Sequence, residues 1–479
     1  MSSPLSETPT STGHTPAQRT PRVGAMLAAL MLAAFVAILN ETVLSVALPQ
    51  LMVDFSIDAS VAQWLTTGFL LTMAIVIPIT GFLTGRFSRR ALFIAAMLAF
   101  IVGTALAAIA PSFGIMLVAR VIQAFGTAII MPLLMSTTIL LVAPQRRGAM
   151  MGLNAVVISV GPAVGPTLAG IVMNWLTWHW VFLLMLPIAV VILVFGALVL
   201  RVPFDGHATR LDLVSVVLSA LGFGGLVYAL ASFSSILAGD FVAIALGAIG
   251  VLCLVLFVRR QLRRGKTNEA LLDVRAFAVP AFSRAVVLVG LAFAIMLGAV
   301  IILPIYFQDG LGQTVLETGL LLLGGGLTQA IAAPIFGRLF DRVGARPIVV
   351  PGAVVLLLAS ILLASIGGST PVGLVVLYYV LLSIGLASIL STMMTLSMAS
   401  LEPRLIGHGS AIVNTMQQLG GAIGTAALVA ALTIGGAAAS TASAAVLAGT
   451  TAAFVLAAVL AAASVVIALF VRPRTSAGH

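Results

Sequence analysis

The sequence predicts an all-α integral membrane protein with fourteen transmembrane helices. Three observations lead to this fold class. Hydrophobic residues make up 61% of the 479-residue chain, charged residues make up 8%, and the mean hydropathy is +1.23. The apolar residues form long segments, and a helix needs about 20 such residues to cross a bilayer. The basic residues fall in alternate connections between these segments, which orients the chain in the membrane.

Fourteen segments are long and apolar enough to span the membrane. They cover residues 25–48, 62–84, 92–110, 113–141, 149–174, 180–200, 212–232, 241–258, 283–307, 318–337, 347–366, 371–399, 408–434 and 447–471. If the N-terminus lies in the cytoplasm, 22 of the 23 basic residues fall on the inner side, and the remaining one, Arg120, lies within a span. A count of thirteen helices would break this rule. We therefore expect a multi-pass protein of the cell (plasma) membrane with both termini cytoplasmic.

The chain repeats itself at a spacing close to 256 residues. The basic loop at 81–90 returns at 337–346, Leu48-Pro49 returns as Leu303-Pro304, and Asn154 with Gly161 returns as Asn414 with Gly421. Three matches in order indicate two pseudo-symmetric six-helix bundles. Bundles of this kind bind substrate near the midplane and rock against each other.

The repeat divides the chain into six parts. We expect a disordered cytoplasmic tail at 1–24, the N-terminal bundle at 25–200, two inserted helices at 201–258, a basic cytoplasmic loop at 259–282, the C-terminal bundle at 283–471 and a short tail at 472–479. The net charge of +10 does not indicate nucleic-acid binding, because the basic residues are spread over the inner loops.

Glu41 is the one acid well inside a predicted span. A carboxylate in hydrocarbon is costly, so its presence there indicates a functional site. It can bind and release a proton or a cation. The alternative is a structural acid held against a helix end or a cavity water.

Arg120 on the fourth span is a second intramembrane charge. An arginine stays protonated at ordinary pH, so it acts as a fixed positive charge and not as a proton carrier. Near Glu41, its charge and the burial of the carboxylate would act on the proton affinity in opposite directions. The alternative is that Arg120 extends its head group toward the membrane interface.

Gly161-Pro162-Ala163-Val164-Gly165-Pro166 repeats a Gly-Pro dipeptide on the fifth span, and Gly170 follows. Proline bends a membrane helix and small residues allow close approach of another helix. Small-residue packing alone is the alternative explanation.

The two basic loops are the copies of the longest repeated motif. Their glycines permit tight turns, and an acid with arginines can form a charge latch on the inner face. The second copy has the acid, and the first has Gly85 in its place. The residues singled out in the two copies are Gly81, Arg86, Arg89, Arg90, Gly337, Asp341, Arg342, Gly344 and Arg346. Loops that only set the topology are the alternative.

These motifs, with Leu39-Asn40-Glu41-Thr42 and the run 46–49 on the first span, resemble the major facilitator superfamily over residues 25–471. Within it they are most similar to the fourteen-helix drug:proton antiporters of the lincomycin-resistance type. The resemblance implies that Arg120 takes part in proton transfer, that the doubled Gly-Pro motif belongs to exporters, and that Glu41 stands in for an aspartate one residue earlier. The first basic loop departs from the family pattern at Gly85 and Ser88, so the second copy is expected to dominate.

Several amides in the predicted spans are candidates for lining the substrate cavity. They are Asn40, Gln123, Asn154, Gln329, Asn414, Gln417 and Gln418. Buried amides also hold helices together, which is the alternative role for each. His408 is expected to be structural. Trp175, Trp178 and Trp180 cluster at the outer ends of two spans, where an interfacial belt is expected.

No motif for an enzyme, an ATP-binding loop or a metal site is evident, so we expect a transporter driven by the proton gradient without a cofactor. The expected function is proton-coupled antiport that exports amphiphilic drugs or antibiotics by alternating access. The expected partners are the lipid bilayer, protons and a small amphiphilic substrate, with no nucleic acid and no second subunit. The alternatives are export of one endogenous metabolite or lipid precursor and, less favoured, a proton-coupled importer or a membrane sensor.

Overall fold

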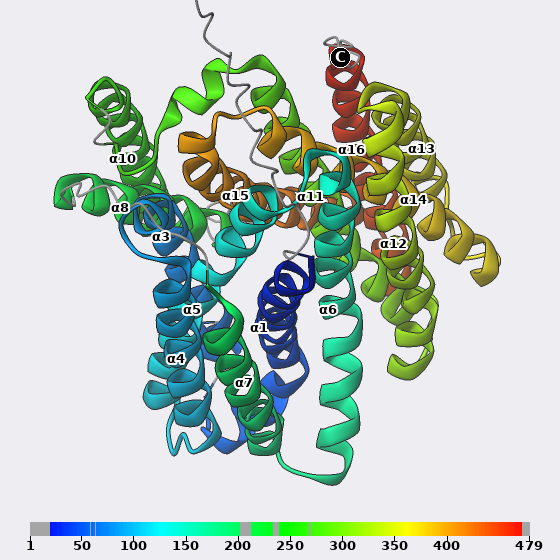
Figure 1. The fold of residues 1–479 in the computed structure, drawn as a ribbon. Helices are drawn as coiled ribbons and strands as arrows, with labels where there is room; N and C mark the ends of the chain where they lie inside the picture. Colours follow the sequence, from blue (N-terminus) through cyan, green and yellow to red (C-terminus); the bar gives the residue numbers. More distant parts are fainter. Residues whose placement is uncertain are drawn as a thin grey trace, which may run out of the picture.

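The structure is a computed structural model that describes residues 20–57, 59–62, 64–201, 212–232, 239–267 and 270–471. Its long elements are all helices (Figure 1), and no strand occurs among these residues. Thirteen of the described helices are long and apolar enough to cross a membrane. A further long helix, Arg147–Trp175, includes side chains outside the described part. The all-helical membrane architecture is therefore confirmed, and the count of fourteen spans stays a prediction.

The N-terminal group contains six long helices and two short ones. They are α1 (Thr20–Asp54), α2 (Ala59–Ala62), α3 (Trp64–Arg86), α4 (Arg89–Ala108), α5 (Phe113–Leu141), the 3-10 turn η1 (Pro144–Arg146), α6 (Arg147–Trp175) and α7 (His179–Val199). In Figure 1, α1 stands between α5 and α6 with α7 beside it, and α1 contacts all three. The central position of α1 places its polar residues where several helices meet.

Two inserted helices flank this group. They are α8 (Leu213–Ala231) and α10 (Phe241–Gly265). The two pack closely at Gly225 and Gly250, and α8 also contacts α3 and α15. Because α10 continues to Gly265, the first part of the predicted basic loop at 259–282 is helical. The C-terminal group begins before the end of that predicted loop as well.

The C-terminal group again contains six long helices. They are α11 (Pro280–Ile305), α12 (Val315–Val343), α13 (Arg346–Ala364), α14 (Val372–Ala399), α15 (Ile406–Gly436) and α16 (Ala442–Leu469), with short turns η2 (Val274–Ala278), η3 (Tyr306–Gly310) and η4 (Pro403–Leu405). The predicted tails at 1–24 and 472–479 lie largely outside the described residues, although α1 already begins at Thr20. Local sequence explains some ends: Thr314 and Glu317 form a capping box that starts α12, and Gly344, with φ of 82°, ends it.

The two groups meet in a crosswise pattern. The second helix of each group packs against the fifth helix of the other, so that α3 contacts α15 and α12 contacts α6. Both contacts include the end of the bundle that carries the connections at 87–88, 142–146, 344–345 and 400–405, which we call the basic end. This arrangement is the one expected of two repeated six-helix units related by a pseudo-two-fold axis.

The three tryptophans predicted to form an interfacial belt differ in their exposure. Trp175 and Trp180 are exposed on the bundle surface. Trp178, by contrast, is only 1% exposed, and its indole nitrogen donates a hydrogen bond of 2.7 Å to Asp54 at the end of α1. The prediction for Trp178 was wrong because the apolar run did not indicate that Asp54 would offer a buried indole an acceptor.

Candidate functional site

Arg120 is the centre of a buried polar cluster between α1, α3 and α5. Its side chain is fully buried, and its guanidinium donates to Oε1 of Gln123 at 2.9 Å and to the carbonyl oxygen of Asn40 at 3.5 Å. The guanidinium carbon lies 4.2 Å from the centre of the Phe69 ring, so that the ring also stabilises the charge. Arg120 therefore does not extend to the interface.

Gln123 connects this charge to two further helices. Its side-chain nitrogen donates to the Thr104 hydroxyl on α4 at 3.0 Å and to Oδ1 of Asn40 on α1 at 3.5 Å. Nε of Arg120 and Nδ2 of Asn40 are buried and have no hydrogen-bond partner among the described residues. Buried donors of this kind retain the capacity to bind a polar atom.

Glu41 follows Asn40 on α1 and is partly exposed. Its charge and that of Arg120 interact through space. Among the described side chains, however, Arg120 is held by Gln123, Asn40 and Phe69, and no ion pair joins it to Glu41. The structure thus brings the two predicted charges into one region and leaves the carboxylate outside the hydrogen-bonded cluster.

The glycines of the doubled Gly-Pro motif pack on either side of Glu41. A methyl group added at Gly161 would overlap the side chain of Ile38, and one added at Gly165 would overlap the Thr42 hydroxyl. Thr42 also donates to the carbonyl of Gly161 at 3.4 Å. The two helices therefore touch backbone to side chain at these positions, one turn of α1 apart.

The rest of that motif is less informative. The side chains of Pro162 and Pro166 lie outside the described part of the structure. Gly170 is exposed, and a methyl group added there would meet no atom within 4 Å. Close helix approach is thus a property of the first two glycines, and Gly170 takes no part in it.

The second basic loop forms a latch between the two groups. The Asp341 carboxylate, near the end of α12, accepts hydrogen bonds from the backbone N–H groups of Gly148 at 2.8 Å and Ala149 at 2.9 Å, in the first turn of α6. A helix N-terminus carries unpaired N–H groups and favours a negative charge. Gly337 and Gly148 make this possible, because a side chain on either would overlap the backbone of the other helix.

The first basic loop makes a different contact. A methyl group added at Gly81 would lie 2.8 Å from Nδ1 of His408, and one added at Gly407 would lie 2.5 Å from the Thr84 hydroxyl. A methyl group added at Gly85, at the place of the missing acid, would meet no atom within 4 Å. His408 therefore lies against this loop, as a packing residue of the contact between α3 and α15.

The remaining basic residues of the two loops lie at the same end. Arg86, Arg90, Arg342 and Arg346 are exposed, whereas Nε of Arg89 is buried and has no partner among the described residues. Gly344 ends α12 with a positive φ, as the tight turn in the motif requires.

The predicted cavity amides outside the Arg120 cluster share one feature, which is a contact with methionine sulfur. The pairs are Asn154 with Met151 at 3.6 Å, Gln329 with Met296 at 3.7 Å, Asn414 with Met135 at 3.1 Å, Gln417 with Met394 at 3.7 Å and Gln418 with Met73 at 3.5 Å. Asn414 and Gln418 reach across to the N-terminal group, and the other three stay within their own group. Asn154 also donates to the Thr138 hydroxyl at 3.1 Å.

A polar network at the basic end supports the inserted helices and the segment that follows them. Arg260 and Arg264 on α10 pair with Asp212 before α8, and Gln261 donates to Ser215 at 2.7 Å. The hydrogen bond from Arg260, which outweighs the opposing effect of burial, lowers the pKa of the Asp212 carboxyl.

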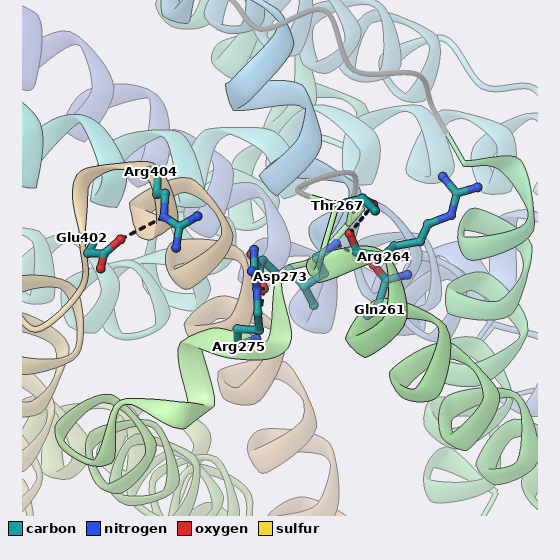
Figure 2. Close-up of polar contacts among 8 residues, drawn as sticks. Gln261, Arg264, Thr267, Asp273, Arg275, Glu402 and Arg404 are labelled. Carbon is teal, nitrogen blue, oxygen red and sulfur yellow. Dashed lines mark hydrogen bonds and ion pairs between the residues drawn. The ribbon is translucent and has the colours of Figure 1, made fainter.

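A second part of this network lies beside α15 (Figure 2). Arg275 pairs with Asp273 at 2.6 Å, and Arg404 pairs with Glu402 at 2.8 Å. Burial acts to raise the pKa of Asp273, but the hydrogen bonds from Arg275 together outweigh this effect, so the net pKa is lowered. Within the described residues, no group of three His, Cys, Asp or Glu side chains could hold a metal ion.

Sequence reasoning missed several residues that complete the site. Phe69 contacts Arg120, and Thr104 contacts Gln123, from neighbouring helices. Gly148 and Ala149 donate the backbone hydrogen bonds of the latch to Asp341. Thr42, which follows Glu41, was recognisable only as part of the first-helix pattern. Its nearness to the Gly-Pro motif is a tertiary contact, and the sequence held no signal for it.

Comparison with known proteins identifies the family. The Major Facilitator Superfamily model matches residues 30–425. The chain is 36% identical over 410 residues to the lincomycin resistance protein LmrB of Listeria monocytogenes serovar 1/2a, with 86% of each chain covered. It is 30% identical over 412 residues to the multidrug resistance protein B homolog of Mycobacterium tuberculosis (strain CDC 1551 / Oshkosh), covering 84% of this chain and 75% of the relative.

Solved structures share the fold at low sequence identity. The human organic anion transporter MFSD10 superposes with a TM-score of 0.65 at 17% identity, covering 94% of this chain and all of its own. A double-tryptophan mutant of XylE gives a TM-score of 0.66 at 15% identity, covering 95% and 96% of the two chains. With a superfamily match over most of its length and relatives at 30% identity or more, the chain belongs to the Major Facilitator Superfamily of membrane transporters.

Proposed function

We propose that this transporter is a proton-coupled antiporter that exports amphiphilic drugs or antibiotics from the cytoplasm or the inner leaflet. One observation carries the proposal: Ile38 and Thr42, three residues before and one residue after Glu41 on α1, pack against Gly161 and Gly165 on α6. Because Glu41 lies between these contacts, a change in its charge acts at the place where the two helices touch. Binding of a proton is thereby coupled to helix position.

Arg120 supplies a fixed positive charge near the carboxylate. Its hydrogen bonds to Gln123 and Asn40 hold it in place, so the charge does not move when Glu41 binds or releases a proton. A proton and a substrate would compete for the site, and each would favour the state that it binds better. The proton gradient drives the cycle, and the Arg120 cluster requires no cofactor.

The latch between Asp341 and α6 supports alternating access. It lies at the basic end, which we assign to the cytoplasm on the distribution of the basic residues, with both termini on that side of the plasma membrane. Closure there corresponds to a state in which the substrate route opens to the outside. Both six-helix groups belong to one chain, so a monomer is sufficient for the cycle.

The substrate class is supported by the relatives and by the spans. The relatives named for lincomycin and multidrug resistance are 36% and 30% identical to this chain over most of its length. Methionine and apolar surfaces adapt to varied guests, and such side chains surround the amides of the spans. These features favour a range of amphiphilic compounds over one endogenous metabolite.

The test is transport by the purified protein in liposomes with an imposed proton gradient. Lincomycin movement and proton movement, reported by a pH-sensitive dye, are compared in the wild type, in Glu41→Gln and in Glu317→Gln. Glu317 is an exposed acid at the start of α12, and glutamine preserves its capping role. We expect coupling to be lost only in Glu41→Gln. If Glu41→Gln still exchanges protons for lincomycin at the wild-type rate, the assigned proton site is wrong.

A further inference from the structure

The contact of α15 with the N-terminal group contains two amide–methionine pairs. Nδ2 of Asn414 lies 3.1 Å from the sulfur of Met135 on α5, and Nε2 of Gln418 lies 3.5 Å from the sulfur of Met73 on α3. Asn414 and Gln418 are four residues apart, so they lie on the same face of α15. We call these four side chains the amide–thioether seam.

The seam lies inside the membrane span. Asn414 lies about 12 Å along α15 from the start of the helix at the basic end, and Gln418 lies about 18 Å along it, at 1.5 Å per residue. The hydrocarbon core is about 30 Å thick, so the seam begins beyond the latch and reaches the middle of the membrane. This is the depth at which transporters built from two repeats bind their substrates.

The two sides of the amide–thioether seam belong to different helix groups. On its other face α15 packs tightly on α11, because a methyl group at Gly420 would overlap the backbone of Gly290 and one at Gly424 would overlap that of Ala294. Asn414 and Gln418 therefore belong to the C-terminal group, and the two methionines belong to the N-terminal group. Rocking of the groups must separate the amides from the sulfurs.

In both pairs a strong amide donor faces a weak acceptor, the methionine sulfur. A thioether sulfur is a poor hydrogen-bond acceptor, whereas an amide N–H donates well to oxygen. Buried polar groups in a membrane normally obtain better partners, because an unsatisfied group is costly in hydrocarbon. Among the described residues, Gln418 has no other hydrogen bond, and the hydroxyl of Thr415, which lies between the two amides in the sequence, has no hydrogen-bond partner. The seam therefore keeps unused capacity to donate hydrogen bonds.

We propose that the seam recognises substrate oxygen: Asn414 and Gln418 leave Met135 and Met73 and donate to carbonyl, ether or hydroxyl oxygens of a neutral amphiphile. The flexible methionines then pack against its apolar part. A cation is a poorer match, because the described contacts of both amides come from sulfur and from the Ser410 carbonyl, and none comes from a carboxylate. The proposal rests on the exporter function proposed above and narrows its substrates to neutral compounds rich in oxygen acceptors.

The substitution pairs make opposite predictions for the two sides of the seam. Asn414→Leu and Gln418→Leu remove the donors, whereas Met135→Leu and Met73→Leu keep the volume and remove the competing sulfur. If the amides serve substrate, the first pair weakens binding and the second strengthens it. If the amides only hold helices together, all four substitutions act in the same direction.

The experiment measures equilibrium binding of two radiolabelled probes to the full-length protein in nanodiscs. Chloramphenicol is neutral and carries amide, hydroxyl and nitro oxygens, and tetraphenylphosphonium is a cation without a hydrogen-bond acceptor. We expect each amide substitution to weaken chloramphenicol binding about five-fold, the effect of one neutral hydrogen bond, and to leave tetraphenylphosphonium unchanged. Met97→Leu, which removes a sulfur from the buried core of the N-terminal group, is the matched control and should change neither probe.

Three results would overturn the proposal. The first is equal loss of both probes in the amide variants, and the second is weaker chloramphenicol binding in the two methionine variants of the seam. The third is wild-type protein that binds tetraphenylphosphonium and not chloramphenicol. In the third case, export of the cation against protons would keep the proposed exporter function intact. Failure of Glu41→Gln to alter lincomycin transport, by contrast, would contradict the proposed function and leave the seam untouched.

Discussion

The carboxylate of Asp341 accepts a hydrogen bond of 2.8 Å from the backbone N–H of Gly148, which joins the last turn of α12 to the first turn of α6. A second bond from Ala149 makes the contact bidentate. The partners are backbone groups of a helix N-terminus, so the strength of the contact depends on the charge of Asp341 and not on the residue type at 149.

Asp341→Asn should open the basic end. An amide offers one oxygen to two N–H groups and turns its own donor toward the other, so both bonds are weakened. Spin labels at Gln145 and Arg338, in a Cys253→Ser background, report the separation of the two helices by pulsed dipolar spectroscopy. We expect the population with a long distance to rise about ten-fold, the scale of one charge-assisted hydrogen bond. Glu402→Gln, an exposed acid at the same end, is the control and should leave the distances unchanged.

Gly165→Ala should separate α1 from α6. The added methyl group overlaps the Thr42 hydroxyl, and overpacking of this kind costs about 1–3 kcal/mol. We expect a lower apparent melting temperature and loss of proton-driven transport. Gly170→Ala adds the same group where it meets nothing and should behave as the wild type. Restored transport in the double variant Gly165→Ala/Thr42→Ala would identify the overlap as the cause, and its failure would point to the helix backbone.

Arg120→Lys should abolish coupling although it keeps the charge. A lysine ammonium cannot bridge Gln123 and the Asn40 carbonyl in the same geometry, and it loses the planar contact with Phe69. We expect the rate of proton-coupled transport to fall about ten-fold or more, in line with the loss of a charge-assisted hydrogen bond. Arg404→Lys alters an exposed ion pair and should have little effect. Wild-type rates in Arg120→Lys would mean that charge alone suffices.

Asp212→Asn should loosen the inserted helices in a pH-dependent manner. The pKa of Asp212 is lowered in the folded protein, so its ion pair with Arg260 stabilises the fold fully above the unfolded carboxyl pKa of about 4. The stabilisation declines as the pH falls below that value toward the lower folded pKa. Melting temperatures of wild type and variant should therefore differ by a constant amount from pH 7 to about 5, and the difference should begin to shrink below about 4. A difference that stays constant as the pH is lowered below about 4 would show that the ion pair is not its source.

Gly85→Asp should install a second latch. Gly85 occupies the position of Asp341 in the other repeat, and a side chain there has open space. The spacing of 260 residues that relates Asn154 to Asn414 places His408 and Gly409, in the first turn of α15, at the positions of Gly148 and Ala149 in α6. We expect a larger fraction of molecules to be closed at the basic end. Transport should therefore be slower, as measured by turnover in liposomes. Unchanged turnover would mean that the two crosswise contacts are not equivalent.

The sequence was sufficient for the all-helical membrane architecture and for singling out the charged residues. Composition predicted the helices, Glu41 and Arg120 stood out because charges are rare within spans, and Asp341 stood out as the acid of the repeated basic loop. The difference between Gly85 and Asp341 was also visible, and the structure places a hydrogen-bonded latch at Asp341. What the chain shows in one dimension was therefore predictable.

Contacts between helices were not predictable in this way. Phe69 beneath Arg120 and Met73 beside Gln418 are ordinary apolar residues in ordinary spans, and only tertiary packing gives them polar partners. Trp178 was misplaced for the same reason, since its acceptor Asp54 is 124 residues away. One sequence specifies such pairings through packing energies that no local pattern displays.

The two crosswise contacts are unequal, so the separation of the two helix groups is expected to be asymmetric. The α6–α12 side is fastened by a charge on backbone donors, and the α3–α15 side meets through glycine, histidine and threonine surfaces. If the groups separate at the basic end as proposed above, the α3–α15 contact should open at a lower cost than the α6–α12 contact, which the Asp341 carboxylate fastens. The opening would then lie beside α8, which contacts both α3 and α15.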